Sequence, residues 1–197
     1  MQVKIKSSKT VYEGFFCLKK FELQYERFDG KLSQPVTLEC VERGDAVAVL
    51  LYDPHRDELV LIRQFRIGSH LAGDGGWTLE IVAGSSKDPA NNQIEAQREV
   101  EEETGWQLQR LLPITSYFLS PSGSSEKIHL YYGEIDSQNP TSAGGGVEAE
   151  VEDIQTVVLT YDEAMEQINS SKISSATVIL ALQWLTANRQ RLRAEAK

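Results

Sequence analysis

The sequence predicts an α/β protein in which a small antiparallel β-sheet precedes a larger sandwich of strands and helices. Three observations support this prediction. The first 43 residues alternate short apolar and polar runs, whereas the chain from Asp45 onward alternates buried-strand patterns with helical ones. The last predicted helix, residues 175–193, carries one apolar stripe. We therefore expect an N-terminal β subdomain, residues 1–44, and a main α/β domain, residues 45–197.

The N-terminal subdomain is predicted from three β-prone runs: Tyr12–Lys20, Phe21–Phe28 and Gln34–Val41. Asp29-Gly30 stands between two of these runs, and Asp-Gly in that position is a strong hairpin signal. So small a sheet cannot bury a core by itself. We expect it to pack against its own domain or against a second subunit.

The main domain begins with two predicted buried strands, Ala46–Tyr52 and Glu58–Arg63, joined by a turn at Asp53-Pro54. A third strand, Trp77–Val82, leads to Gly84. The remaining predicted elements are strands at 111–119, 127–135 and 154–159 and helices at 161–170 and 175–193, the last with a stripe of Val178, Ala181, Leu182 and Leu185. The loop 137–147 contains Gly144-Gly145-Gly146 and is predicted to be a flexible linker or a lid.

A helix between Asp88-Pro89 and Gly105 carries the most informative cluster of the chain. Asp and Pro suit a helix start, and Gly suits the position after the last turn. Ile94 and Val100 offer it a sparse apolar contact. On this helix Glu99, Glu102 and Glu103 share one face, which indicates either a site for Mg²⁺ or Mn²⁺ or a solvated acidic surface.

The spacing around this helix resembles the box that defines the Nudix hydrolases, G-x5-E-x7-R-E-U-x-E-E-x-G-U. The matching residues are Gly84, Arg98, Glu99, Val100, Glu102, Glu103, Gly105 and Trp106. One position departs, since Ala90 stands where the family has the first Glu. The resemblance implies the Nudix fold, an α/β/α sandwich, and hydrolysis of a diphosphate.

The flanking segments resemble the ADP-ribose pyrophosphatase and nucleotide-sugar diphosphatase branch of this family. Pro121, 15 positions after Trp106, is the residue that marks the branch. The resembling segments are Val47–Leu51, Leu59–Arg66, Trp77–Gly84, Ser120–Glu126 and Glu148–Ile154. The similarity extends over about residues 11–190, which is most of the chain.

The resemblance implies a set of metal ligands and a general base. The ligands would be Glu99, Glu103, Glu152 and the backbone carbonyl of Ala83, with Glu102 as a further acidic catalytic residue. The distal acidic segment would supply Glu150 as the base that deprotonates water, with Glu148 as the alternative. No Ser or Cys nucleophile is required, because phosphoryl transfer depends mainly on positioning and charge neutralisation.

The resemblance also implies substrate contacts. Arg66 would bind phosphate or base, and Arg63 is a weaker candidate on the opposite strand face. The remaining candidates are Phe15 for stacking on the base from a partner subunit, Arg43, and Ser122, Gly123 and Glu126 in the loop after the predicted strand 111–119. Thr37 and Leu38 stand where branch members carry basic residues, so one contact to the nucleotide is expected to be missing.

The composition limits the alternatives. The net charge of −9 argues against binding of nucleic-acid polymers. No apolar run is long enough for a membrane span, and the N-terminus lacks the features of a secretory signal. Cys17 and Cys40 match no metal or redox spacing, which favours reduced thiols in a cytoplasmic protein.

We therefore expect a homodimeric, Mg²⁺-dependent hydrolase that converts ADP-ribose to AMP and ribose 5-phosphate. A first alternative is a diphosphatase for GDP-mannose or another nucleotide sugar, because the segment Ala143-Gly144-Gly145-Gly146-Val147-Glu148 resembles the loop of relatives with that preference, and the missing basic residue weakens the case for ADP-ribose. A second alternative is a catalytically impaired Nudix domain that binds a nucleotide to regulate a partner, which Ala90 would favour.

Overall fold

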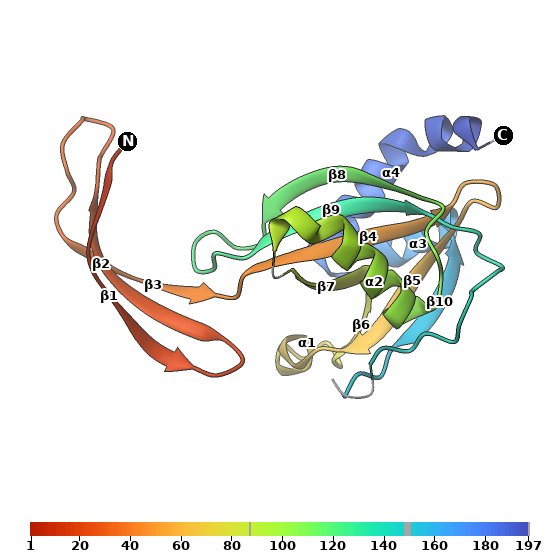
Figure 1. The fold of residues 1–197 in the computed structure, drawn as a ribbon, viewed down its shortest axis with the longest axis horizontal. Coiled ribbons are helices and arrows are strands. Elements are labelled where there is room, and N and C mark those ends of the chain that lie inside the picture. The colour runs from red at the N-terminus through yellow and green to blue at the C-terminus, as the bar shows by residue number, and fades with distance from the viewer. Residues whose placement is uncertain (87, 148–150, 197) are drawn as a thin grey trace. The chain divides into compact units, whose positions relative to one another are not determined.

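The computed structural model describes residues 1–86, 88–147 and 151–196. The chain forms two compact units (Figure 1). The N-terminal unit comprises Met1–Asp45 and Tyr117–Ile128, and the main unit comprises Ala46–Ser116 and His129–Lys197. Residues 117–128, which we expected in the main domain, cluster with the N-terminal strands.

The N-terminal unit contains an antiparallel sheet in the order β1 (Val3–Glu13), β2 (Cys17–Tyr25) and β3 (Val36–Glu42). The small antiparallel sheet predicted from the sequence is confirmed. Its first strand was not predicted, because the polar run Lys4–Thr10 hides the pattern. In the structure this strand is exposed along its whole length, so no burial constrains its sequence. The turn at Asp29-Gly30 forms as expected, with Gly30 at φ 77°.

The main sheet has the strand order β10-β5-β4-β9-β8, with β6 beside β5 and β7 beside β4. These strands are β4 (Asp45–Asp53), β5 (Glu58–Phe65), β6 (Trp77–Glu80), β7 (Val82–Ser86), β8 (Arg110–Phe118), β9 (Lys127–Glu134) and β10 (Gln155–Thr160). The helices are α1 (Ile67–Leu71), α2 (Asn92–Thr104), α3 (Tyr161–Asn169) and α4 (Ala176–Glu195).

The two faces of β4 explain the layered arrangement of the main unit. Val47 and Val49 belong to a core cluster that includes Val100 of α2, whereas the alternate residues of β4 point to the other face. Tyr52 on that other face lies against Tyr132, which in turn contacts Trp184 of α4. Figure 1 shows α2 on one face of the sheet and α3 and α4 on the other. The predicted sandwich is confirmed.

The two C-terminal helices end the chain as predicted. α3 begins with a capping box, in which Thr160 accepts a hydrogen bond from the Glu163 N–H and the Glu163 carboxylate binds the Thr160 N–H. The predicted stripe of α4, from Val178 to Leu185, is fully buried. Among the described residues, no helix is sufficiently long and apolar to cross a membrane.

The segment leading to the acidic helix differs from the prediction. The single expected strand Trp77–Val82 is divided at Ile81 into β6, which pairs with β5, and β7, which pairs with β4. β7 passes through Gly84 and ends at Ser86. The helix α1 was not predicted, since five residues without a buried side chain give no periodic signal.

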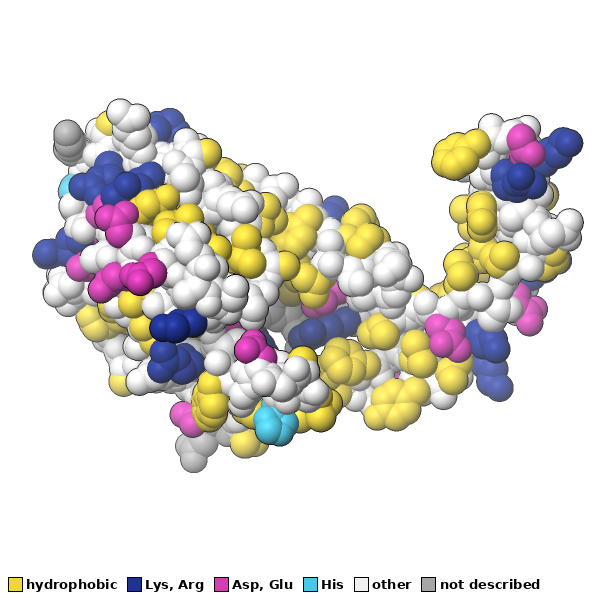
Figure 2. All heavy atoms as spheres, turned by 180° about the vertical axis from the view of Figure 1, so that it is seen from behind, with side chains coloured by type: hydrophobic (Ala, Val, Ile, Leu, Met, Phe, Trp, Pro, Cys, Tyr) yellow, Lys and Arg dark blue, Asp and Glu magenta, His cyan; other side chains and the backbone are white. Residues whose placement is uncertain are grey.

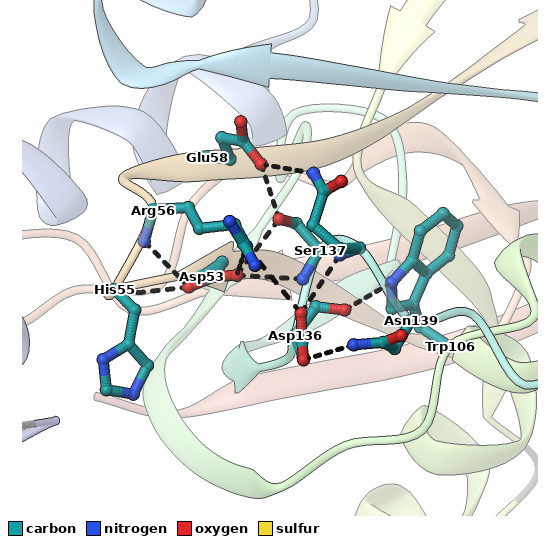
Figure 3. A network of polar contacts seen from close by, with 9 residues as sticks. Asp53, His55, Arg56, Glu58, Trp106, Asp136, Ser137 and Asn139 are labelled. Atoms are coloured by element: carbon teal, nitrogen blue, oxygen red, sulfur yellow. Dashed lines mark hydrogen bonds and ion pairs between the residues drawn. The ribbon is translucent and has the colours of Figure 1, made fainter.

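The loop after β9 is held by a polar network at its start (Figure 3). Asp53, at the end of β4, is 2% exposed and accepts hydrogen bonds from the N–H and the hydroxyl of Ser137. The Ser137 hydroxyl also contacts Glu58. The indole Nε1 of Trp106 donates to the carbonyl of Asp136 at 2.9 Å. The start of the loop 137–147, predicted to be a flexible linker or a lid, is therefore tied to the main unit by hydrogen bonds.

Candidate active site

The acidic face of α2 is positioned by the buried face beside it. Ala96 and Val100, spaced i and i+4, are fully buried in the core, and this fixes the rotation of the helix. Glu103 continues the buried side and is 2% exposed, while Glu99 lies at its margin. The expected apolar contact of Ile94 is wrong, because that side chain is 63% exposed and points to the solvent side of the helix.

Both ends of α2 are stabilised locally, although the start differs from the expectation. The Asp88 carboxylate accepts the Ala90 N–H, but within a 3₁₀ turn, Pro89–Asn91, that precedes the helix. Asn91 occupies the N-cap position itself. Gly105 ends the helix in the left-handed conformation, φ 79°, as predicted. Ala90 lies in this 3₁₀ turn, which forms without the Glu of the family box.

Glu103 is the central side chain of the candidate site. Its carboxylate accepts a hydrogen bond from the backbone N–H of Ala83 on β7. Among the described residues, its Oε2 atom finds no hydrogen-bond partner. Burial, followed by the nearby charges of Glu99 and Glu152, raises the pKa of Glu103 to about 9. A buried carboxylate oxygen without a donor is costly unless a cation binds there.

Glu99 and Glu102 are held by a single arginine. Arg98 forms ion pairs with Glu95, Glu99 and Glu102, and the contact with Glu102 is very short. The carboxylate of Glu99 lies over Gly84, in space that a side chain at that position would fill. Burial raises the pKa of Glu99, while Arg98 acts in the opposite direction. A cation at this site would therefore compete with Arg98 for Glu99.

Glu152, in the distal loop, lies within electrostatic range of the same carboxylates. Its charge acts on both Glu99 and Glu103, and its Oε2 accepts the N–H of Val147 at 3.1 Å. The predicted base Glu150 and its alternative Glu148 lie outside the described residues. Of the distal acidic segment, the structure therefore places Glu152 within range of the charges of Glu99 and Glu103.

Arg66, at the end of β5, is held by Glu80 on β6, which was not among the residues expected at the site. Its guanidinium binds the Glu80 carboxylate through Nε at 3.2 Å and Nη2 at 2.8 Å. Thr78, two residues earlier on β6, donates to the same carboxylate at 2.6 Å. The charges of Glu103 and Glu152 also act on Arg66. The available signal was the alternation of Thr78 and Glu80 on one face of a strand, opposite the buried Leu79.

The N-terminal unit contains a second group of predicted residues. Arg43 pairs with the buried carboxylate of Glu126 at 3.5 Å. Its guanidinium also lies 5.7 Å from the ring centre of Phe15 and 5.5 Å from that of Phe16. Phe15 is 84% exposed, so its ring offers an open apolar surface beside a cation.

The loop 120–126 lies against the end of β3 within the same unit. The N–H of Val41 donates to the carbonyl of Gly123 at 2.8 Å, and the N–H of Ser125 donates to the carbonyl of Val41. Ser122 is exposed, and a side chain at Gly123 would meet no atom within 4 Å. Backbone pairing with β3 therefore fixes the position of this loop, whose last residue is Glu126.

The candidate residues thus form two groups, one in each unit. The main unit brings together Ala83, Glu99, Glu103, Glu152 and Arg66, and the N-terminal unit brings together Phe15, Arg43, Ser122, Gly123 and Glu126. Within the described ranges, no three Asp, Glu, His or Cys side chains are already gathered as they would be around an ion. The donor set nevertheless fits a hard divalent cation, because Glu103 Oε2 is buried without a donor and Glu99 approaches closely over Gly84.

Comparison with known proteins agrees with this geometry. The model of the NUDIX domain matches residues 42–179. The chain belongs to the Nudix family. It is 37% identical to the ADP-ribose pyrophosphatase of Escherichia coli strain K12 over 195 residues, 98% of this chain and 92% of the relative. It is 32% identical to the GDP-mannose pyrophosphatase of Cronobacter sakazakii over 186 residues, 94% of this chain and 95% of the relative.

A solved structure confirms the fold of this Nudix chain. The crystal structure of an ADP compounds hydrolase matches it with a TM-score of 0.71 at 20% sequence identity. The match covers 95% of this chain and 96% of the other. The Nudix fold predicted from the box is therefore confirmed over nearly the whole chain.

Proposed function

We propose that this Nudix protein is a Mg²⁺-dependent hydrolase of the diphosphate bond in nucleoside diphosphate sugars. ADP-ribose is the main substrate, and AMP and ribose 5-phosphate are the products. The observation that carries the proposal is the buried carboxylate of Glu103, whose Oε2 has no donor among the described residues and which feels the charges of Glu99 and Glu152. The relatives named ADP-ribose pyrophosphatase, 37% identical over nearly the full chain, support the choice of substrate.

Four groups of the main unit would hold Mg²⁺, or Mn²⁺ in its place: the carboxylates of Glu99, Glu103 and Glu152 and the carbonyl of Ala83. When bound, the cation neutralises the diphosphate and lowers the pKa of water. Arg66, fixed by Glu80, would offset further negative charge on the phosphates. Arg98 would keep Glu102 oriented toward the site while Glu99 turns to the cation.

The general base is assigned to Glu150 from the family resemblance. It would remove a proton from a water molecule that attacks one phosphorus, and the bond to the bridging oxygen would break as the second phosphate leaves. Glu148 is the alternative base. Neither residue is among those that the structure describes, so this assignment depends on the sequence.

The N-terminal group would bind the nucleoside and sugar. Phe15 offers an exposed ring for stacking on the base, and Arg43 lies against that ring while it pairs with Glu126. Ser122 and Gly123 would contact the sugar side through the backbone of their loop. A ribose phosphate carries hydroxyl donors that suit the Glu126 carboxylate.

A homodimer is proposed because the N-terminal sheet exposes much apolar surface. Figure 2 shows hydrophobic side chains gathered on this sheet. Those of Val3, Ile5, Val11 and Tyr12 are between 51% and 61% exposed. Patches of this kind mark interaction sites.

The two cysteines are free thiols, which suits the cytoplasmic location expected from the sequence.

GDP-mannose is the second candidate substrate. The relatives named GDP-mannose pyrophosphatase, 32% identical in Cronobacter sakazakii, support it. Thr37 and Leu38 in place of basic residues also weaken the case for an ADP-specific contact. The regulatory alternative depends on Ala90, but the 3₁₀ turn and α2 form around this residue.

The test is product chromatography after incubation with Mg²⁺ and ADP-ribose, GDP-mannose or another nucleotide sugar. We expect AMP from ADP-ribose, loss of turnover in Glu103→Gln, and normal turnover in Glu101→Gln, an exposed residue of the same helix. Preference for GDP-mannose would change the substrate but keep the chemistry. Tight nucleotide binding without product, with Mn²⁺ also tried, would contradict the enzymatic proposal.

A further inference from the structure

The C-terminal end of α2 is covered by a distant segment that we call the glycine strap, residues 141–147. The N–H of Gly145 donates to the carbonyl of Glu103 at 3.0 Å, and the N–H of Gly146 donates to the carbonyl of Glu102 at 3.1 Å. The N–H and the hydroxyl of Thr141 both donate to the carbonyl of Gly105. Carbonyls in the last turn of a helix have no partner within it. Here the strap provides that partner to the residues that carry the site.

The strap requires glycine for its shape and for its closeness to the helix. Gly144, Gly145 and Gly146 have φ values of 60°, 108° and 86°, which L side chains rarely adopt. A side chain on Gly144 would lie 2.4 Å from the carbonyl carbon of Thr104, and one on Gly105 would lie 2.3 Å from the carbonyl oxygen of Ser142. The two backbones therefore touch directly.

The other side of the strap contacts Glu152. The N–H of Val147 donates to Oε2 of Glu152, and the N–H of Ile154 donates to the carbonyl of Gly145 at 3.2 Å. A side chain on Gly146 would lie 2.8 Å from Glu152 Oε2 and 2.7 Å from its Cβ. The same short segment thus binds the backbone at Glu102 and Glu103 and the side chain of Glu152.

The start of the loop is fixed independently. Ser137 is tied to Asp53, and the carbonyl of Asp136 accepts the indole N–H of Trp106, one residue beyond the helix end (Figure 3). The Asn139 amide also binds the Asp136 carboxylate. The residues that precede the strap are therefore held in place by hydrogen bonds that do not involve the strap itself.

We propose that the glycine strap positions Glu152 relative to the carboxylates of α2 and so sets the strength of divalent-cation binding. This inference rests on the proposed function of the site. The strap contributes no ligand of its own; it acts by holding Glu152 at a fixed separation from Glu99 and Glu103.

Gly146→Ala and Gly145→Ala form a matched pair for the test. Both residues have positive φ, so an added methyl strains the backbone in both variants. At Gly145 the nearest atom to the new methyl is the carbonyl oxygen of Ile154 at 3.9 Å, whereas at Gly146 the methyl collides with Glu152. At Gly146 the methyl also lies 3.2 Å from Cδ1 of Ile154, so the difference between the two variants reports both contacts, and the Glu152→Gln background separates the part that is due to Glu152.

The measurement is Mn²⁺ titration of the full-length protein followed by electron paramagnetic resonance, with thermal melting in parallel. We expect Gly146→Ala to weaken Mn²⁺ binding about tenfold more than Gly145→Ala, as for other groups that orient metal ligands, with similar melting temperatures. In a Glu152→Gln background the extra effect of Gly146→Ala should vanish, since the group it displaces is no longer a charged ligand. Equal weakening in the two glycine variants, or an undiminished effect in the Glu152→Gln background, would overturn the proposal.

A third variant covers the case in which Gly146→Ala does not fold. Thr141→Val removes only the hydroxyl donor to Gly105 and should weaken Mn²⁺ binding by about threefold, as loss of one hydrogen bond suggests. Unchanged Mn²⁺ affinity in that variant would then contradict the proposal.

The binding readout separates the two proposals: selective weakening in Gly146→Ala supports the strap even if the wild type cleaves no nucleotide sugar. If the wild type cleaves a nucleotide sugar but the two glycine variants lose the same Mn²⁺ affinity, the strap proposal fails while the proposed function stands.

Discussion

A methyl group on Gly84 would lie 1.9 Å from Oε1 of Glu99. This distance is far below van der Waals contact, and Cδ and Cγ of the same side chain would lie at 2.0 Å and 2.5 Å. Gly84 and Glu99 therefore occupy one shared space, where β7 passes beneath α2. The glycine of the Nudix box is required here by the side chain above it.

Gly84→Ala should therefore displace Glu99 and weaken cation binding by about 10–100-fold, the usual cost of disturbing a group that orients a metal ligand. The measurement is Mn²⁺ or Mg²⁺ affinity by calorimetric titration. Gly68→Ala is the control, because a methyl there meets no atom within 4 Å. Unchanged affinity in Gly84→Ala would show that Glu99 is not a ligand.

Glu80→Gln should raise KM for the nucleotide sugar by about tenfold or more, since Arg66 would lose a charge-assisted partner worth about 1.5–3 kcal/mol. We expect kcat to change less, because Arg66 keeps its own charge. Steady-state kinetics at saturating Mg²⁺ measure both parameters. The control is Gln155→Ala. This variant removes the hydrogen-bond partner of Arg63, which lies on the face of β5 opposite to Arg66. Equal effects in both variants would remove Arg66 from the substrate site.

Asp57→Asn should destabilise the fold by about 1–2 kcal/mol at pH 7, a discounted value for a partly exposed carboxylate. Asp57 pairs with Arg189 and Arg193 and accepts the Tyr52 hydroxyl at 2.7 Å. Burial opposes its charge, but these partners prevail and lower its pKa to about 2. Asn also tolerates the positive φ of 63° at this position.

The pH dependence of this effect follows from the direction of the shift. A carboxylate whose pKa is lowered in the folded state contributes stability above its unfolded value of 3.8 and loses it as the pH falls toward 2. The difference between wild type and Asp57→Asn in urea denaturation should thus fall by about half at pH 3. Asp162→Asn, at an exposed position of α3, should show little difference at either pH. A constant difference would contradict the ion-pair explanation.

Asp53→Asn should cost about 2 kcal/mol or more, because an amide keeps only one acceptor oxygen. In the wild type one carboxylate oxygen accepts the N–H groups of His55 and Arg56, and the other accepts two donors from Ser137. Ser137→Ala removes only the hydroxyl and should cost about 1 kcal/mol. Urea denaturation measures both. A loss below 0.5 kcal/mol for Asp53→Asn, about the size of a surface substitution, would show that water replaces these bonds.

The sequence predicted the parts of the fold that bury regular patterns. The strands β4 and β5 and the stripe of α4 follow from apolar spacing alone, and the left-handed end of α2 follows from Gly105. The polar strand β1 and the short helix α1 were missed because neither buries a side chain.

The candidate site was predicted from spacing only in part. Glu99 and Glu103 lie one turn apart on a helix, so local geometry brings them together. Glu80 and the glycine strap act through long-range contacts, in which a strand carboxylate meets Arg66 and a loop backbone meets a helix end. No local period encodes such contacts. The three glycines gave the only signal, and in the structure they have positive φ and approach the end of α2 closely, which their sequence did not predict.

The ion pair between Asp57 and Arg189 also bears on how the protein is made. The two residues are 132 positions apart, and Arg193, the second partner, follows later still. During synthesis the β4–β5 turn therefore emerges long before its counter-charges exist. Contacts that close such long loops form late. We expect the nascent chain to acquire its protease-resistant main unit only after α4 has left the ribosome.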